Sequence, residues 1–167
     1  LREKVVVQPC VTTVINKLFA VKKKENTRKV GVNIAFDREE QRYGAYKEII
    51  LEKIAKAVSE ISQSGYRICY IAHCDEDLKF LEFLDRLNID YKLYNLTCAL
   101  PGEIVSCYHN MSIVLGMRGH AQMIPFGMGC RIISLGTHDK MKWFLEDIGA
   151  MEWYIDMEKL CGGGMIM

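Results

Sequence analysis

Short apolar runs alternate with amphipathic stretches over most of this chain. Five runs are dense enough in apolar residues, and clearly enough bounded by turn residues, to predict buried strands. The expected strands cover residues 30–36, 67–72, 91–94, 112–115 and 131–135, with a last short one at 152–155. Between them, apolar side chains recur every three or four residues, which is typical of amphipathic helices. The expected helices cover residues 12–18, 45–62, 75–87, 101–108, 119–127 and 139–147.

Turn residues predict where several of these elements begin and end. Asp75 is expected to cap its helix, and Pro101 is expected to open the next one. Gly65 and Gly149 are stop signals for the helices that precede them. The polar stretch at 37–44 is expected to be a loop.

Strands that alternate regularly with helices predict crossover connections and a mostly parallel sheet. Near-continuous apolar strands fit a sheet that is covered on both faces. The chain has 167 residues, which is enough for one domain with a sizeable core and too few for two comfortable ones. The predicted fold class is therefore α/β, with a doubly wound, Rossmann-like sheet.

The domain proper is expected to span residues 30–157. Residues 1–29, with a β-like run at 5–7, are predicted to be a lead-in segment and linker, and residues 158–167, which contain three consecutive glycines, a flexible tail. Since the sequence opens at Leu1 without a Met, we expect a fragment of a longer protein with a further domain on its N-terminal side.

Composition and charge narrow the class of protein. The net charge of +1 gives no general attraction to nucleic acid or to an anionic membrane, and no window resembles a signal peptide or a spanning helix. The seven cysteines are odd in number and none forms C-x-x-C, so we expect reduced, mostly buried thiols in a cytoplasmic protein. A zinc site is the alternative, but no histidine pairs with a cysteine at ligand spacing, and no metal is expected.

Polar turns follow three of the predicted strands, and ligands of open α/β sheets bind beyond the carboxyl ends of the strands. The strand at 112–115 leads into Gly-Met-Arg-Gly-His at 116–120, and the strand at 131–135 leads into Gly-Thr-His-Asp-Lys at 136–140. The strand at 67–72 leads into His-Cys-Asp-Glu-Asp at 73–77. Each turn is expected to end at a helix N-terminus.

These turns favour a small, multiply charged anion as the ligand. Helix N-termini offer free N–H groups and a partial positive charge. Arg118 adds a planar fork for carboxylate or phosphate, Lys140 adds a point charge, and His120 can move protons near neutral pH. A cation in a first helical turn opposes the helix dipole by roughly 1 kcal/mol at most, so the position of Lys140 is a mild indication of function.

The same side chains also have structural interpretations. Arg118 could cap a neighbouring helix, His120 could be a half-buried, hydrogen-bonded histidine, and Lys140 could be solvated. The structural interpretation is the favoured one for four other residues: His73, His138, Asp75 as an N-cap and Glu103 as a first-turn helix acid. Competing motifs are missing from the sequence, which has no G-x-G-x-x-G after the first strand, no P-loop and no G-x-S-x-G.

The segment Gly-Met-Arg-Gly-His-Ala at 116–121 resembles the G-x-R-x-H-A motif of the polysaccharide pyruvyl transferase family. In that family the motif follows a strand and precedes an apolar helix, a Gly, another strand, and a Lys-containing turn before a helix ending in Leu-Glu-Asp-Leu-Gly. This chain has the same order, with Gly129, the strand at 131–135 and Leu-Glu-Asp-Ile-Gly at 145–149. The resemblance covers roughly residues 30–157, and residues 8–13 also resemble the lead-in of some members.

Two departures from the family pattern concern the helix after the motif. Position 119 is Gly, where the family often has a larger apolar residue, and Pro125 and Gly127 interrupt the helix. These departures affect the expected geometry of the helix, and leave the match of the basic residues unchanged.

The resemblance implies one half of a GT-B fold, in which two Rossmann-like domains face a cleft. It implies phosphoenolpyruvate as the donor, a sugar of a cell-surface or exopolysaccharide precursor as the acceptor, and a pyruvate ketal as the product. By position, His120 is the expected acid–base residue, and Arg118 and Lys140 are the expected anion clamps. The same two turns supply three further expected substrate-binding positions: Gly116, Thr137 and His138.

The resemblance also bears on partners. The family uses a basic residue of its N-terminal domain, so this chain alone is expected to be inactive. No cofactor, metal or nucleic acid is implied, and membrane contact would be at most peripheral, through a lipid-linked acceptor. A glycosyltransferase domain that binds a nucleotide sugar is the alternative enzyme, and a non-catalytic interaction module is the third possibility.

Overall fold

The computed structural model describes residues 10–20 and 27–160, and its centre is a six-stranded, all-parallel sheet. The strand order is β3-β2-β1-β4-β5-β6. The strands are β1 (Lys29–Asn33), β2 (Arg67–Ala72), β3 (Tyr91–Asn95), β4 (Ile113–Gly116), β5 (Arg131–Gly136) and β6 (Tyr154–Asp156). The order reverses direction between β1 and β4, so the chain winds outward to each edge from the middle of the sheet. The predicted α/β, Rossmann-like class is therefore confirmed.

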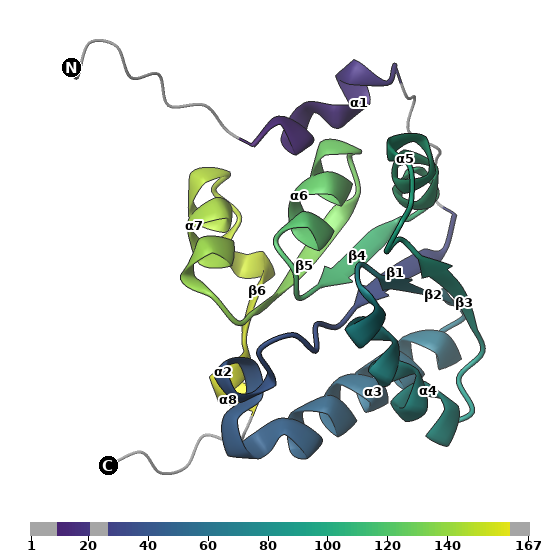
Figure 1. Cartoon of the computed structure of the whole chain (residues 1–167), viewed down its shortest axis with the longest axis vertical. Helices are drawn as coiled ribbons and strands as arrows, with labels where there is room; N and C mark the ends of the chain where they lie inside the picture. Colours follow the sequence, from purple (N-terminus) through teal and green to yellow (C-terminus); the bar gives the residue numbers. More distant parts are fainter. Residues whose placement is uncertain (1–9, 21–26, 161–167) are drawn as a thin grey trace, which may run out of the picture.

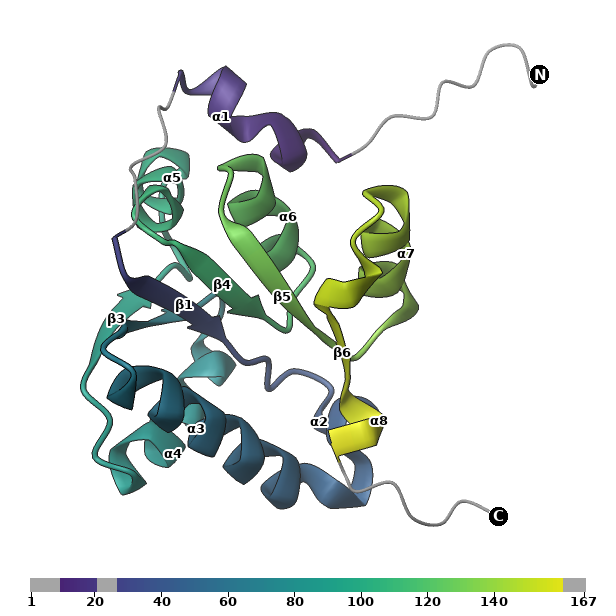
Figure 2. The same ribbon diagram turned by 180° about the vertical axis from the view of Figure 1, so that it is seen from behind.

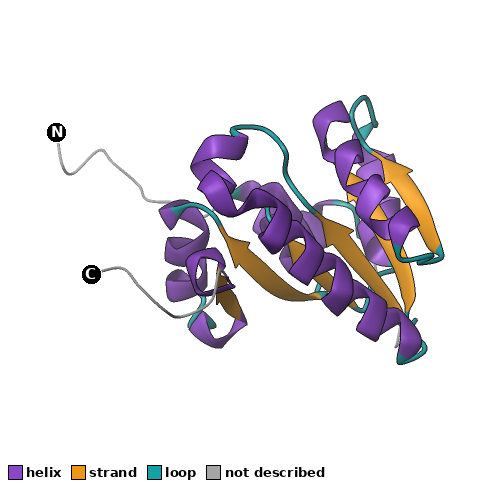
Figure 3. Cartoon of the chain, turned by 90° about the horizontal axis from the view of Figure 1, so that it is seen from below, coloured by secondary structure: helices purple, strands orange, loops and turns teal. Residues whose placement is uncertain are grey.

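Helices cover both faces of the sheet (Figure 1). They are η2 (Val11–Val14), α1 (Ile15–Leu18), α2 (Glu39–Tyr43), η3 (Gly44–Tyr46), α3 (Lys47–Gln63), η4 (Asp75–Phe80), α4 (Leu81–Arg86), α5 (Pro101–His109), α6 (His120–Gly127), α7 (Asp139–Asp147), η5 (Met151–Trp153) and α8 (Met157–Leu160). The α3 and α4 helices lie on one face, and α5, α6 and α7 lie on the other, as the view from behind also shows (Figure 2). Seen from below, helices lie in front of the strands and behind them (Figure 3).

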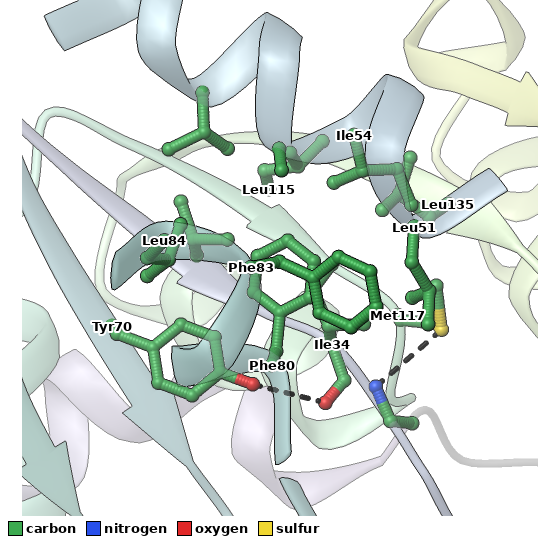
Figure 4. Close-up of a cluster of buried hydrophobic side chains, with 14 of the residues drawn as sticks. Ile34, Leu51, Ile54, Tyr70, Phe80, Phe83, Leu84, Leu115, Met117 and Leu135 are labelled. Carbon is green, nitrogen blue, oxygen red and sulfur yellow. Dashed lines mark hydrogen bonds between the residues drawn. The ribbon is translucent and has the colours of Figure 1, made fainter. Parts of the chain in front are cut away.

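The core on the α3 face is continuous from helix to sheet. The α3 helix buries Ile50, Leu51, Ile54 and Val58, at the spacing that places them on one side of a helix. These side chains pack on the strands together with Phe80, Phe83 and Leu84 (Figure 4). Alternation along the strands directs the remaining apolar side chains to the α5–α6 face, where Ile71, Val114 and Tyr108 are buried.

The lead-in segment packs on the domain where the structure describes it. Residues 11–18 form η2 and α1, close to the helix expected at 12–18, and η2 contacts α6. A Cβ added at Gly127 would clash with the carbonyl oxygen of Thr12, so the glycine permits this close approach. The β-like run expected at 5–7 and most of the expected tail at 158–167 lie outside the described residues.

Two local predictions are wrong. The expected loop at 37–44 contains the α2 helix, a five-residue segment too short to show helical periodicity in the sequence. Asp75 is not an N-cap: Cys74 holds that position, the helix begins as a 3-10 segment, and the Asp75 carboxylate accepts a hydrogen bond from Thr97 at 3.1 Å.

Candidate functional site

The β4 strand delivers Arg118 to the carboxyl edge of the sheet, beside the point where the strand order reverses. Gly116 ends the strand, and a Cβ there would lie 2.6 Å from the carbonyl oxygen of Ala121 in α6. Only glycine lets the first turn of α6 approach the strand so closely. Met117 then points into the core (Figure 4), and the backbone N–H of Ala35 contacts its sulfur at 3.4 Å. The turn is therefore fixed on both sides of Arg118.

Asp77 is the principal partner of Arg118. The Arg118 Nε donates to both Asp77 oxygens, at 2.9 and 3.2 Å, and Nη2 donates to Oδ1 at 2.6 Å. The Asp77 carboxylate has no exposed surface, and it also accepts hydrogen bonds from the backbone N–H of His73 at 3.0 Å and the Asn33 amide at 3.2 Å. The loops after β1, β2 and β4 thus converge on one buried ion pair.

Asp37 links this pair to the next loop along the sheet. One Asp37 oxygen lies 2.7 Å from Arg118 Nη2, and both oxygens accept hydrogen bonds from Arg42 Nη2 at 3.0 Å. The Arg42 side chain, only 4% exposed, also donates from Nη1 to the Thr137 hydroxyl at 2.6 Å. A chain of alternating charge therefore runs from Asp77 to Thr137.

Burial and charge shift the pKa values of these groups. Burial disfavours the charged form of Arg118, but the hydrogen bonds and charge of Asp77 outweigh it and raise the pKa of the guanidinium. Burial also tends to raise the pKa of Asp37, yet Arg42 and Arg118 together hold it below its ordinary value. Both residues are therefore charged across the physiological range.

His120 is the first residue of α6 and its side chain is exposed. No hydrogen bond or ion pair joins it to another residue within 10–20 and 27–160. Burial lowers the pKa of His73 to about 4, and the charges of Arg118 and His120 both lower it as well. The His73 Nε2 lies 2.6 Å from the Tyr108 hydroxyl. The structural interpretation of His73 therefore agrees with these contacts.

Lys140 is the second residue of α7, where its exposed ammonium has no hydrogen bond or ion pair to the described part of the chain. The Thr12 hydroxyl and backbone lower the pKa of the Cys10 thiol, and Lys140 adds a smaller effect of the same sign. Lys140 is therefore close enough to the start of η2 for its charge to act on Cys10. Whether Lys140 joins Arg118 and His120 around one ligand stays a prediction.

The other two predicted positions, Thr137 and His138, lie at a cavity of about 620 Å³ at the ends of β5 and β6. Gly136, Thr137 and His138 line it together with Arg42 and Lys142. A Cβ at Gly136 would clash with the Tyr154 ring, so the glycine is required by packing. Burial, with the nearby Arg42 charge, lowers the pKa of His138.

No motif or spacing in the sequence selects Asp37, Arg42 or Asp77 as site residues. Asp77 stands in the acidic turn that was singled out, but only the folded chain shows that this carboxylate, and not that of Asp75, turns inward. Glu103 does act as a first-turn acid, because its carboxylate accepts a hydrogen bond from the Leu100 N–H at 2.7 Å.

One cysteine contacts the site, because Arg118 Nη2 donates a hydrogen bond to the Cys74 sulfur at 2.8 Å. Of the six described cysteines, Cys69, Cys107 and Cys130 are buried. Among the described residues, no group of three His, Cys, Asp or Glu side chains is placed to hold a metal ion. No helix in the described ranges combines the length and the apolar character needed to cross a bilayer.

The fold and the edge define a Rossmann-like α/β domain that carries a guanidinium and an imidazole at the switch point of its sheet. A family model described as polysaccharide pyruvyl transferase matches residues 1–139. The chain therefore belongs to the polysaccharide pyruvyl transferase family, which is a family of transferases. Searches among curated proteins and among solved structures found no match.

Proposed function

We propose that this domain binds phosphoenolpyruvate, and that the complete enzyme transfers its pyruvyl group to two hydroxyls of a sugar in a cell-surface or exopolysaccharide precursor. The observation that supports this most directly is the state of Arg118. Its Nε and Nη2 are engaged by protein carboxylates, whereas its Nη1 donates to no described residue. A guanidinium held in this way can offer its free N–H groups to a carboxylate or a phosphate.

We assign the proton transfers to His120, which follows Arg118 by two residues and begins α6. Ketal formation adds a proton to C3 of phosphoenolpyruvate and a sugar oxygen to C2, then expels phosphate as a second sugar oxygen bonds to C2. One hydroxyl proton balances the new methyl group, and the other leaves with the phosphate or to solvent. An exposed imidazole at a helix N-terminus, without a partner in the described chain, is suited to move such protons, an effect of about 10²–10⁴-fold.

The acceptor and the remaining partners follow from the same proposal. The sugar approaches from a second, N-terminal domain that supplies a further basic residue, and a lipid-linked acceptor would bring the enzyme to a cytoplasmic membrane surface. The donor does not require that domain for initial binding, because Arg118 and its carboxylates are complete within this chain.

Isothermal titration of the purified chain tests the donor. We expect phosphoenolpyruvate to bind more tightly than pyruvate or inorganic phosphate, and UDP-glucose to bind no better than phosphate. His120→Asn should keep much of the binding, since Arg118 holds the charge, and His109→Asn on α5 is the matched control. Tighter binding of UDP-glucose would favour a nucleotide-sugar enzyme instead, and no binding of any of these anions would contradict the proposal.

A further inference from the structure

We propose that Asp77 is a positioning residue for the donor, because it determines which edge of the Arg118 guanidinium faces the ligand. The inference rests on the proposed function for the identity of the ligand. Its structural basis is independent of the ligand, and lies in the hydrogen bonds that Asp77 makes inside the protein.

Asp77 occupies the lateral edge of the guanidinium, formed by Nε and Nη2. The two nitrogens approach its oxygens at 2.9 and 2.6 Å, which is the geometry of a bidentate carboxylate pair. The terminal edge is formed by Nη1, which donates to no described residue, and by Nη2, which also contacts the Cys74 sulfur at 2.8 Å and Asp37 at 2.7 Å. Nη1 is therefore the nitrogen left for an incoming carboxylate or phosphate.

The carboxylate is itself held so that it cannot follow Arg118. The backbone N–H of His73 and the Asn33 amide bind Oδ2, and the backbone N–H of Phe36 approaches Oδ1 at 3.4 Å. These donors come from the ends of β1 and β2, two adjacent strands that are hydrogen-bonded to each other. Asp77 therefore holds the guanidinium in a defined position relative to the sheet, which is what a residue that supports a binding group must do.

Asp37 provides an internal comparison, because it is a second carboxylate near the same nitrogen. Its contact with Arg118 is an ion pair to Nη2 alone, its side chain is 35% exposed, and its hydrogen bonds go to Arg42. It lies beside the terminal edge, where an anionic ligand would compete with it. Asp77 should therefore support donor binding, whereas Asp37 should contribute little to it or oppose it.

The decisive comparison is between Asp77→Asn and Asp37→Asn in the purified chain, titrated with phosphoenolpyruvate. We expect the dissociation constant to rise at least tenfold in Asp77→Asn and to change by less than threefold in Asp37→Asn. Circular dichroism should show both variants folded, since each substitution keeps the shape of the side chain. Equal effects in the two variants would overturn the assignment.

Arg118→Lys gives a second route that does not depend on Asp77→Asn folding. A lysine can pair with Asp77 but has no second edge to present, so phosphoenolpyruvate binding should fall although the ion pair is retained. In this background Asp77→Asn should weaken binding no further, because Asp77 acts through the guanidinium. Wild-type binding by Arg118→Lys, or a full additional loss in the double variant, would contradict the proposal.

A spectroscopic measurement separates this inference from the proposed function. In ¹⁵N NMR spectra the Nε–Hε resonance of Arg118 should be slow to exchange in the wild type and should move strongly in Asp77→Asn, with no ligand present. A wild type that shows this resonance but binds no phosphoenolpyruvate would refute the donor and leave the positioning intact. A resonance unchanged by Asp77→Asn would refute the positioning whatever the ligand.

Discussion

The loops after β4 and β5 occupy equivalent places on neighbouring parallel strands, yet their charged side chains are held very differently. The first loop sends Arg118 inward, onto a carboxylate with no exposed surface. The second presents His138 and Lys140 at the surface, and only its Thr137 hydroxyl is held by the charge network, through Arg42. The β4 loop is held by protein contacts before any ligand binds, whereas most of the β5 loop is exposed and can contact a ligand.

This difference separates residues whose loss should damage the fold from residues whose loss should affect only the ligand. Removing one partner of a buried ion pair lowers the stability of the fold strongly, because the other charge stays buried without compensation. Exposed cations without partners carry no such penalty. Substitutions along the two loops can therefore test the comparison, beginning with the largest expected change.

Arg118→Ala should cause the largest loss of stability. It leaves the buried Asp77 carboxylate without its guanidinium, and we expect the free energy of unfolding to fall by about 3–5 kcal/mol. Urea unfolding at pH 7 measures this directly. The loss should be clearly smaller when Arg118→Ala is made in an Asp77→Asn background, where no buried charge remains, and an equal loss there would show that the ion pair is not the cause.

Gly116→Ala should come next, with Gly119→Ala as its matched control in the same turn. The added methyl group at Gly116 would meet the Ala121 backbone at 2.6 Å, so α6 must move, at about 1–3 kcal/mol. At Gly119 no atom lies within 4 Å and φ is −54°, so alanine is compatible. In thermal unfolding, Gly116→Ala should have the lower midpoint temperature. Similar midpoints for the two variants would mean that α6 moves aside at little cost.

His73 should make stability depend on pH between about 4 and 6.5. Its pKa is about 4 in the folded chain and about 6.5 when unfolded, so the unfolded state binds the proton first. The contribution of neutral His73 is complete above pH 6.5 and is lost as the pH falls toward 4. Between pH 7 and 5.5 the wild type should lose about 1 kcal/mol more than His73→Gln in urea unfolding. Parallel pH profiles would exclude His73 as the source.

The apolar pattern was sufficient to predict the framework that carries these loops. All six strands were expected, and the four inner strands β1, β2, β4 and β5 are mostly buried apolar runs between turn residues. The edge strands β3 and β6 are only partly buried, and turn residues and apolar content located them. The α2 helix was missed because only Arg42 and Tyr43 of its five residues are buried, so no periodicity can develop. Because this helix was not expected, the sequence did not indicate that Arg42 would reach the site.

The charged network could not be derived from the sequence for a different reason. Asp75 and Asp77 are two residues apart in one acidic turn, and a 3-10 segment, not the expected α-helix, decides which one turns inward. The carboxylate partners of Arg118 are 41 and 81 positions away in the chain, and only the sheet topology brings them together. Residue types predicted an anion site here, but not the protein carboxylates that hold its arginine.

Lys140→Gln should have the smallest effect on stability and tests the open loop most directly. The ammonium has no partner in the described chain and opposes the dipole of α7, so its removal should stabilise the protein by a few tenths of a kcal/mol. If Lys140 clamps the donor, the dissociation constant for phosphoenolpyruvate should nevertheless rise about tenfold, a change absent from the surface control Lys56→Gln on α3. Unchanged donor binding in Lys140→Gln would remove this residue from the site, and would leave the β4 loop, with Arg118 and His120, as the part of this edge that holds the anion.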